Sequence, residues 1–219
     1  MLFRSPEERA TGDGSYKARI ERNGPKGEKV PGYLTDAFGA DAERVIRESH
    51  AKRPEQPLFL YLAFNAPHTP TQAPEDLTDA MPAALEGKNR RVYAAQIAAM
   101  DRAIGRVRAA LRDTGMDRNT FIVFFSDNGG VNWLDDRMRD RFHMDCPPTS
   151  NLPLRGGKAT MHEGGTREPC IVVWPGVTKP DSTSDAILQS IDFYPTLLEM
   201  TGLRPKAGLK LDGMSFTSA

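Results

Sequence analysis

The chain has 219 residues, enough for one large domain or two small ones. Its 29 lysine and arginine residues balance 29 aspartate and glutamate residues, so the formal net charge is zero. This balance argues against a nucleic-acid-binding surface and against electrostatic attachment to acidic lipid. No apolar run is long enough to span a membrane, and the two cysteines, Cys146 and Cys170, match no metal-ligand spacing and make no disulfide framework.

Residues 1–32 are rich in charge, glycine and proline and have no apolar periodicity, so we expect a polar arm or loop there. They lack the apolar core of a signal peptide, which taken literally indicates the cytoplasm. A signal peptide on a longer precursor would instead place the protein in the periplasm or outside the cell. The ordered domain is expected to cover residues 33–216, with a short tail at 217–219.

Apolar periodicity predicts two helices in the first half of the domain. The first begins near Thr35 or Asp36, either of which can cap it, and ends near His50. The second has apolar side chains at alternating intervals of four and three residues, which form one face that we expect to cover a sheet. That face consists of Tyr93, Ile97, Met100, Ile104, Val107 and Leu111. The opposite face carries Arg102, Arg106, Arg108 and Arg112. Gly115 is expected to end this helix.

Three short apolar runs predict buried strands at residues 58–64, 120–125 and 170–174. The long helix between the first two makes a βαβ unit, so these two strands are expected to be parallel. Their carboxyl ends would then lie at the same rim of the sheet, where ligands bind in open α/β sheets. A final short helix is expected from Asp192, with Pro195 in its first turn and Gly202 at its end.

Polar residues follow each of the first two predicted strands. His68 lies in a loop between two prolines, and Asp127 and Asn128 come directly after residues 120–125. Carboxylate and amide oxygens suit Ca²⁺ or Mg²⁺, although Asp-Asn-Gly-Gly is also ordinary turn chemistry. A histidine in a loop is most often simply exposed. The residues alone leave these alternatives open.

Lys158 follows a long polar loop, residues 131–155, and stands beside two glycines. A lysine in this setting is either a solvent-exposed side chain or a compact positive charge that meets an anion. Glycines at 156, 157, 164 and 165 permit close backbone approach or positive φ angles. Loops as long as this one are usually functional or mobile.

Five motifs now stand in one order along the chain. They are Asn65-Ala-Pro-His68-Thr-Pro70, Ser126-Asp-Asn-Gly-Gly130, Pro153-Leu-Arg-Gly-Gly-Lys158, His162-Glu-Gly-Gly-Thr-Arg167 and Asp192-Phe-Tyr-Pro-Thr-Leu-Leu198. The ordered set closely resembles the type I sulfatases, the arylsulfatase-like branch of the alkaline phosphatase superfamily. Tyr33-Leu-Thr-Asp36 and Leu211-Asp-Gly-Met-Ser215 match flanking family segments, so the resemblance covers nearly all of the ordered chain.

The resemblance implies an α/β, alkaline phosphatase-like fold: a mostly parallel sheet flanked by helices, truncated at its N-terminal side. It implies that Asp127 and Asn128 are ligands of a divalent cation, usually Ca²⁺ and less often Mg²⁺. Lys158 would hold a sulfate oxygen, and His68 would contact the ester and help to protonate the leaving group. His162, Glu163 and Arg167 are expected to be structural. The implied partner is a small-molecule or carbohydrate sulfate ester, and the oligomeric state stays open.

Family members also carry an Asp-Asp pair that completes the metal site and a Cys-x-Pro-x-Arg segment whose cysteine becomes the formylglycine nucleophile. Neither an Asp-Asp pair upstream of Asp127, where the family places it, nor a Cys-x-Pro-x-Arg segment is present in these 219 residues. Cys146 is followed by proline two residues later, but Ser150 stands where the arginine belongs. Because Ca²⁺ takes six to eight oxygen ligands, we expect this chain alone to hold half of the active site, to bind Ca²⁺ weakly and to hydrolyse no sulfate ester. A sheet without its N-terminal strands would also expose an edge prone to aggregation.

Two other functions fit the same residues. The chain can belong to a phosphate or phosphonate ester hydrolase of the same superfamily, since metal ligands and anion-binding residues serve either anion. It can also be a truncated, non-catalytic paralogue whose fold persists as a binding module. The nucleophile would help to separate these enzymes, because serine or threonine indicates phosphate transfer, whereas formylglycine suits both sulfatases and phosphonate monoester hydrolases.

Overall fold

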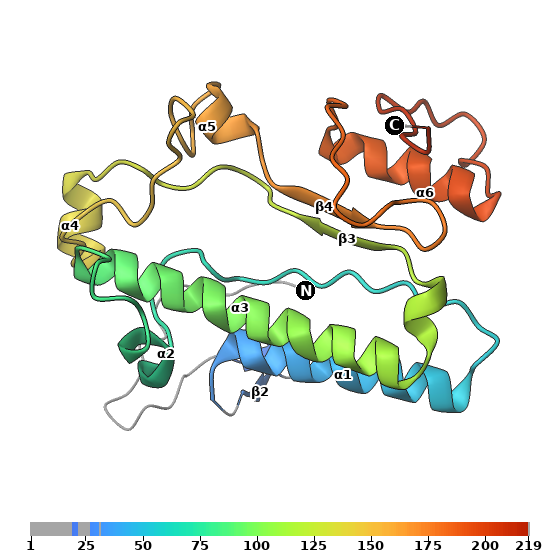
Figure 1. The fold of residues 1–219 in the computed structure, drawn as a ribbon, viewed down its shortest axis with the longest axis horizontal. Helices are drawn as coiled ribbons and strands as arrows, with labels where there is room; N and C mark the ends of the chain where they lie inside the picture. The colour runs from blue at the N-terminus through green and yellow to red at the C-terminus, as the bar shows by residue number, and fades with distance from the viewer. Residues whose placement is uncertain (1–18, 22–26, 31, 219) are drawn as a thin grey trace. The chain divides into compact units, whose positions relative to one another are not determined.

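A computed structural model of the protein describes residues 19–21, 27–30 and 32–218. The chain divides into two compact units, and Figure 1 shows the path of the backbone through their elements. The first unit comprises Met1–Thr120 and Asn128–Glu168, and the second comprises Phe121–Asp127 and Pro169–Ala219. Within the described residues, no helix is both long enough and apolar enough to cross a membrane.

The helices of the first unit are α1 (Leu34–Lys52), α2 (Glu75–Asp79), α3 (Lys88–Asp113), the 3₁₀ turn η1 (Met116–Asn119), α4 (Asp136–Phe142) and α5 (Glu163–Thr166). Both long helices were predicted, and each begins earlier than expected. The long loop after Gly130 contains α4, which the sequence did not predict. Asp135 caps this helix by accepting a hydrogen bond from Met138 N at 2.7 Å.

Two very short strands lie within the predicted polar arm. The strands β1 (Arg19–Glu21) and β2 (Gly27–Lys29) pair antiparallel, with Arg19 opposite Lys29. The expectation of a loop is therefore wrong at these six residues, whose strands are too short to show alternation in the sequence. Residues 1–18 of the predicted arm lie outside the described part of the chain.

The first turn of α1 corrects the predicted cap. Tyr33 occupies the N-cap position without a side-chain cap bond, and Thr35 and Asp36 lie inside the helix. The buried face of α1 consists of Thr35, Phe38, Gly39, Ala42, Ile46 and Ser49. Thr35 is completely buried, and its hydroxyl contacts Asn65 rather than the backbone of the helix end.

The buried face of α3 differs from the predicted one. Its buried residues are Asn89, Ala95, Gln96, Ala99, Ala103, Ala110 and Leu111. Of the predicted face, only Leu111 is buried, while Ile97 is 40% exposed. The alanines allow α3 to pack closely on α1, where the Cβ position at Gly39 lies only 2.8 Å from Ala103 Cβ. The two helices thus pack through the small residues of α3. The prediction followed the spacing of large apolar side chains and therefore did not identify these alanines.

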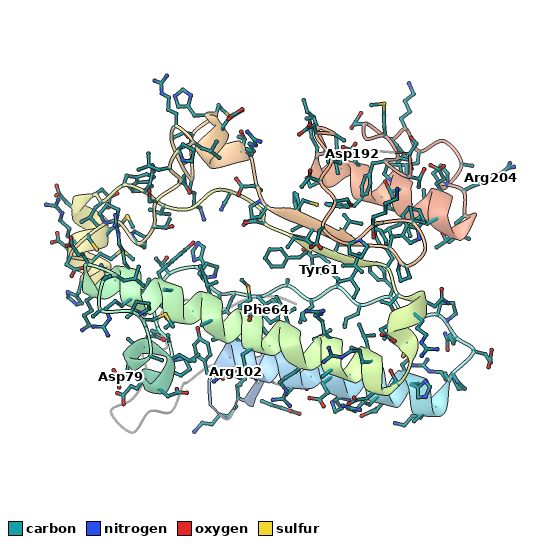
Figure 2. All side chains as sticks on the ribbon, viewed as in Figure 1. Tyr61, Phe64, Asp79, Arg102, Asp192 and Arg204 are labelled. Atoms are coloured by element: carbon teal, nitrogen blue, oxygen red, sulfur yellow. The ribbon has the colours of Figure 1, made fainter. Side chains whose placement is uncertain are left out.

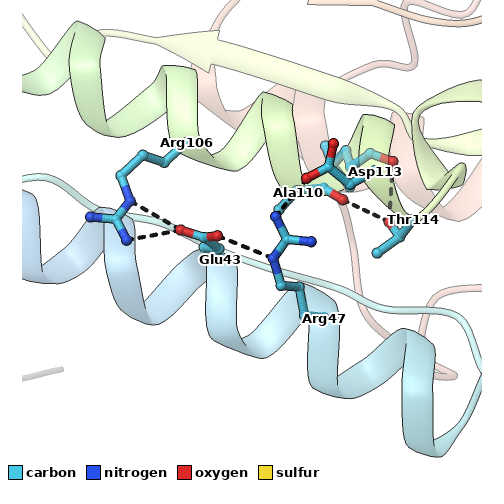
Figure 3. A network of polar contacts seen from close by, with 7 residues as sticks. Glu43, Arg47, Arg106, Ala110, Asp113 and Thr114 are labelled. Carbon is cyan, nitrogen blue, oxygen red and sulfur yellow. Dashed lines mark hydrogen bonds and ion pairs between the residues drawn. The ribbon is translucent and has the colours of Figure 1, made fainter.

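Ion pairs also join α1 to α3, and they engage two of the four arginines expected on the face opposite the apolar one. Arg102 Nη2 lies 2.7 Å from Asp36 Oδ2, and Figure 2 shows this arginine on α3. Arg106 Nη2 lies 2.9 Å from Glu43 Oε2, as Figure 3 shows. Hydrogen bonds donated by Arg106 and by the nearby Arg47 lower the pKa of Glu43 below its usual 4.5.

Replacing Glu43 with glutamine is expected to make stability less dependent on acidic pH. Because the folded pKa of Glu43 is lowered, its charged form contributes stability above pH 4.5, and that contribution is lost as pH falls through the folded pKa. Urea unfolding at about pH 7 and about pH 3 should show Glu43→Gln weakening the protein only at the higher pH. Glu48→Gln is the matched control, since Glu48 pairs only with Arg44 and Lys52 of the same helix. A larger loss in Glu48→Gln would contradict the interhelical role.

The predicted strand at residues 58–64 is wrong in its burial, and its pairing stays a prediction. The segment is extended but belongs to no described ladder. Leu62 and Phe64 pack against a small core of Val30 and Phe38, whereas Tyr61 is 83% exposed. Figure 2 labels Tyr61 and Phe64 on this segment. A run of apolar residues predicts the extended backbone here but does not supply the neighbouring strand that a ladder requires.

The second unit is built on one antiparallel pair. The strands β3 (Ile122–Phe125) and β4 (Cys170–Val173) pair with Ile122 opposite Val173. Both strands were predicted within a residue or two, but β3 is half-buried rather than buried on both faces, and Ile171 of β4 is 58% exposed. Both described ladders are antiparallel. The parallel arrangement of residues 58–64 and 120–125, and the shared rim that it implies, remain predictions.

The final helix matches its prediction. After a 3₁₀ turn, η2 (Ser190–Asp192), α6 runs over Phe193–Thr201 and ends at Gly202, whose φ is 68°. Asp192, labelled in Figure 2, accepts hydrogen bonds from Gln189 N at 2.7 Å and from Met214 N at 2.8 Å. It therefore ties the C-terminal segment to the start of α6, a structural role as expected.

Candidate active site

The backbone of Lys158 is held on both sides of the residue. Its N–H donates to Gly130 O at 3.1 Å, and its carbonyl accepts a hydrogen bond from Trp133 Nε1 at 3.2 Å. The side chain is half-buried and forms no ion pair with any described residue. Lys158 is therefore a positive charge on an anchored backbone, a suitable arrangement for holding an anion.

Glycines around this lysine let two loops approach closely, as the sequence predicted. A Cβ on Gly157 would overlap Gly130 O, and a Cβ on Gly129 would overlap Gly164 O. Gly156 has a φ of 80°, in the left-handed region that favours glycine. The backbone itself thus fills the space between the loops, which leaves little room for either one to shift.

Asp127 and Asn128 follow the end of β3 directly. Asp127 is exposed and belongs to the second unit, while Asn128 is half-buried and belongs to the first. Asn128 Nδ2 donates to Gly129 O at 3.3 Å, and Gly129 N donates to Gly165 O at 3.3 Å. The turn that carries Asn128 is therefore fixed to the backbone of α5.

Asp127 and Asn128 offer a carboxylate and an amide oxygen, the hard donors that Ca²⁺ and Mg²⁺ prefer. Within the described ranges, no group of three or more histidine, cysteine, aspartate or glutamate side chains is placed to hold a metal ion. Two such oxygens fit part of a Ca²⁺ coordination shell, which takes six to eight ligands. The donor chemistry therefore fits the cation, although the described residues do not enclose it.

His68 lies on the loop after residues 58–64 and is exposed. Its Nδ1 is 2.8 Å from Thr69 O. Because a carbonyl oxygen only accepts hydrogen bonds, this shorter contact assigns the proton to Nδ1, while Thr69 Oγ1 lies farther from the same nitrogen, at 3.4 Å. In the neutral ring Nε2 is then an acceptor, and it becomes a donor when the imidazole is protonated.

Three buried side chains from α1, α3 and the residue before α1 hold the loop of this histidine. Tyr33 Oη donates to Gln72 O at 2.9 Å, Thr35 Oγ1 donates to Asn65 Oδ1 at 3.5 Å, and Gln96 Nε2 donates to the histidine carbonyl at 3.4 Å. Burial raises the pKa of Tyr33, which keeps its hydroxyl a donor. Sequence reasoning did not assign these three residues to the site.

The structure therefore brings some of the predicted residues together. Lys158 and the turn of Asn128 are joined directly through Gly130 O. His68 is held by a separate set of contacts in the same unit, whereas Asp127 belongs to the second unit. Two side chains that hydrogen-bond the backbone around Lys158, those of Trp133 and Asn151, were not predicted.

Cys146 lies beside the N-terminus of α3. A Cβ on Gly87 would overlap its sulfur, and the neighbouring Asp145 accepts a hydrogen bond from Lys88 N at 3.0 Å. Burial raises the pKa of the Cys146 thiol, and the Asp145 side chain raises it further. A thiol with a raised pKa is a poor nucleophile, in keeping with the expectation of an ordinary loop thiol.

The sequence profile of the family described as Sulfatase matches residues 5–203. The chain belongs to the sulfatase family. It is 34% identical over 206 residues to a sulfatase of Formosa agariphila, covering 87% of this chain and 34% of that protein. It is 32% identical over 167 residues to human arylsulfatase A, covering 76% of this chain and 29% of that protein. This sulfatase-family chain thus spans about a third of the length of the curated relatives that it matches.

Solved sulfatases share its fold. The structure of Ps i-CgsB superposes with a TM-score of 0.79 at 34% identity, covering 91% of this chain and 40% of that one. PsFucS1 sulfatase from Pseudoalteromonas sp. superposes with a TM-score of 0.67 at 26% identity, covering 90% of this chain and 38% of that one. The predicted alkaline phosphatase-like α/β fold is confirmed, with this chain forming a helix-rich part of it.

Proposed function

We propose that the protein containing this chain hydrolyses sulfate esters and that these residues form one part of its active site. The observation that supports the proposal is the bond between Lys158 N and Gly130 O, which fixes the backbone of this lysine to the turn of Asn128. Membership of the sulfatase family supports the sulfate ester as substrate. The matched relatives include N-acetylgalactosamine-6-sulfatase of the rat and a complex of Ps i-CgsB with k-i-k-neocarrahexaose, which supports a carbohydrate sulfate.

In this proposal Asp127 and Asn128 hold a Ca²⁺ ion. Bound Ca²⁺ would draw negative charge from the sulfate oxygens, as a Lewis acid does. Lys158 holds a sulfate oxygen with its ammonium group, whose charge is most valuable where negative charge accumulates in the transition state. Its anchored backbone limits the entropy lost when the ester binds.

His68 donates a proton to the departing alcohol oxygen. Its Nδ1–H is engaged by Thr69 O, so Nε2 carries a transferable proton only in the imidazolium form. The donor in this step is therefore Nε2 of the charged ring, which becomes neutral as the alcohol leaves. The formylglycine nucleophile expected for the family requires a Cys-x-Pro-x-Arg segment, which residues 1–219 do not contain. We place it elsewhere in the protein, and we expect residues 1–219 alone to be inactive.

Removal of the divalent cation tests this proposal. The enzyme expressed from the complete reading frame should release inorganic sulfate from 4-nitrophenyl sulfate and lose that activity after treatment with a chelator. Added Ca²⁺ should restore the rate more fully than Mg²⁺, because two protein oxygens of this kind suit a larger, flexible coordination shell. Sulfate release that survives complete chelation would contradict the assignment of Asp127 and Asn128 as metal ligands.

A further inference from the structure

Asn151 forms three side-chain hydrogen bonds that join the turn of Asn128 to residues 153–158, which we call the lysine loop. It lies two residues before Pro153, which begins the Pro153–Lys158 motif, and it is half-buried. Its side chain bonds both polar groups of Gly130: Oδ1 accepts from Gly130 N at 3.2 Å, and Nδ2 donates to Gly130 O at 2.8 Å. Nδ2 also donates to Gly156 O at 3.1 Å.

These three bonds link the two parts of the candidate site. Gly130 lies two residues after Asn128, and Gly156 lies two residues before Lys158. One amide group therefore holds the backbone of both segments, and it does so beside the direct bond from Lys158 N to Gly130 O. The side chain of Asn151 bonds both segments. The Asn132 side chain, by contrast, donates to Gly156 O at 2.9 Å and bonds no other described group.

We propose that Asn151 is a positioning residue, which sets the place of the Lys158 ammonium group relative to the turn of Asn128. The inference rests on the proposed function, because it takes Lys158 as the residue that holds the sulfate group. Asn151 touches neither substrate nor metal in this account. It acts by holding the lysine loop in a fixed position relative to the turn of Asn128.

Loss of the amide removes one hydrogen bond from each of three backbone groups. In Asn151→Ala, Gly130 N–H loses its side-chain partner, Gly130 O keeps only Lys158 N, and Gly156 O keeps only Asn132. An unpaired N–H in a packed loop favours rearrangement toward water. A shift of about 1 Å at a reacting group can reduce a rate by about 100-fold, so a small movement of Lys158 is enough.

The test compares two asparagines in the complete enzyme. Asn151→Ala is expected to lower kcat for 4-nitrophenyl sulfate by about 10- to 100-fold, with a smaller change in KM. Asn132→Ala removes a hydrogen bond to the same Gly156 carbonyl without touching Gly130, and it should change kcat by less than about threefold. Equal losses of kcat in the two variants, matched by equal losses of thermal stability, would reduce Asn151 to a structural residue.

A second pair of variants, in which aspartate replaces each asparagine, keeps the side-chain volume nearly unchanged. Asn151→Asp retains an acceptor for Gly130 N but turns a carboxylate toward two carbonyl oxygens, so it should be impaired at least as much as Asn151→Ala. Asn132→Asp adds the same charge to the same loops and serves as its control. If Asn151→Asp keeps the wild-type kcat, the two donated hydrogen bonds are not what positions the lysine, and the proposal fails.

Binding of inorganic sulfate separates this inference from the proposed function. Calorimetric titration with sulfate, in the presence of Ca²⁺, should show about tenfold weaker binding in Asn151→Ala and unchanged binding in Asn132→Ala. If the wild type binds sulfate in this pattern but hydrolyses no sulfate ester, the proposed function fails and the positioning role stands. If the wild type hydrolyses sulfate esters but both variants bind sulfate equally, the positioning role fails. A wild type that neither binds nor hydrolyses overturns both.

Discussion

Replacement of Lys158 by alanine is expected to lower kcat/KM for a sulfate ester by about 100- to 1,000-fold in the complete enzyme. The magnitude follows from removing a single preorganised group that faces developing negative charge. The ammonium group has no described carboxylate partner, and its backbone is held at N–H and carbonyl. Its removal should therefore take away interaction with the substrate while leaving the loop contacts in place.

Two further variants sharpen this result. Lys158→Arg keeps the charge but replaces a compact ammonium with a planar fork, so it should recover only part of the lost activity. Lys179→Ala removes an exposed lysine and the same unit of charge, and it should leave kcat/KM unchanged. The assignment is contradicted if Lys158→Ala and Lys179→Ala have similar rates, or if Lys158→Ala loses activity only because it unfolds at a lower temperature.

Replacement of Gly39 by alanine is expected to destabilise the protein by about 1–3 kcal/mol, the usual cost of overpacking. The new methyl group would lie 2.8 Å from Ala103 Cβ and 3.0 Å from Ala103 Cα, so α1 and α3 must separate. Helix propensity works in the opposite direction, because alanine is favoured over glycine inside a helix by about 1 kcal/mol. A net loss of stability therefore reports the close approach of the two helices.

Gly105 provides the matched control. It lies in α3, is exposed, and has no atom within 4 Å of the position where a Cβ would stand. Gly105→Ala should raise the free energy of unfolding by about 0.5–1 kcal/mol. Denaturant unfolding of the two variants should thus give changes of opposite sign. Stabilisation in both would show that the helices are free to move apart at Gly39.

The elements of this fold with a strong local pattern could be predicted from the sequence. The extent of α3 followed from its apolar spacing, and Gly202 ended α6 as expected. The face of α3 could not be predicted, because its burial depends on a close crossing with α1 that favours Ala99 and Ala103 over the larger Ile97. The segment 58–64 shows the same limit: its composition gives an extended backbone, whereas pairing depends on a neighbour.

Some residues of the candidate site could likewise be predicted from the sequence, and others could not. Lys158 could be singled out because glycines flank it and because its motif stands in order with four others. Asn151, Gln96 and Trp133 could not be, since each makes a contact with a residue 21 to 28 positions away, which no local sequence pattern reveals. The one local signal for Asn151 is its position two residues before the Pro153–Lys158 motif.

The most direct test of the central claim compares a sulfate ester and a phosphate ester that share the same leaving group. Purified enzyme from the complete reading frame, supplied with Ca²⁺, would be assayed with 4-nitrophenyl sulfate and 4-nitrophenyl phosphate under the same conditions. The account predicts a higher kcat/KM for the sulfate and its loss in Lys158→Ala. A higher kcat/KM for the phosphate, or sulfate turnover that Lys158→Ala leaves intact, would contradict it.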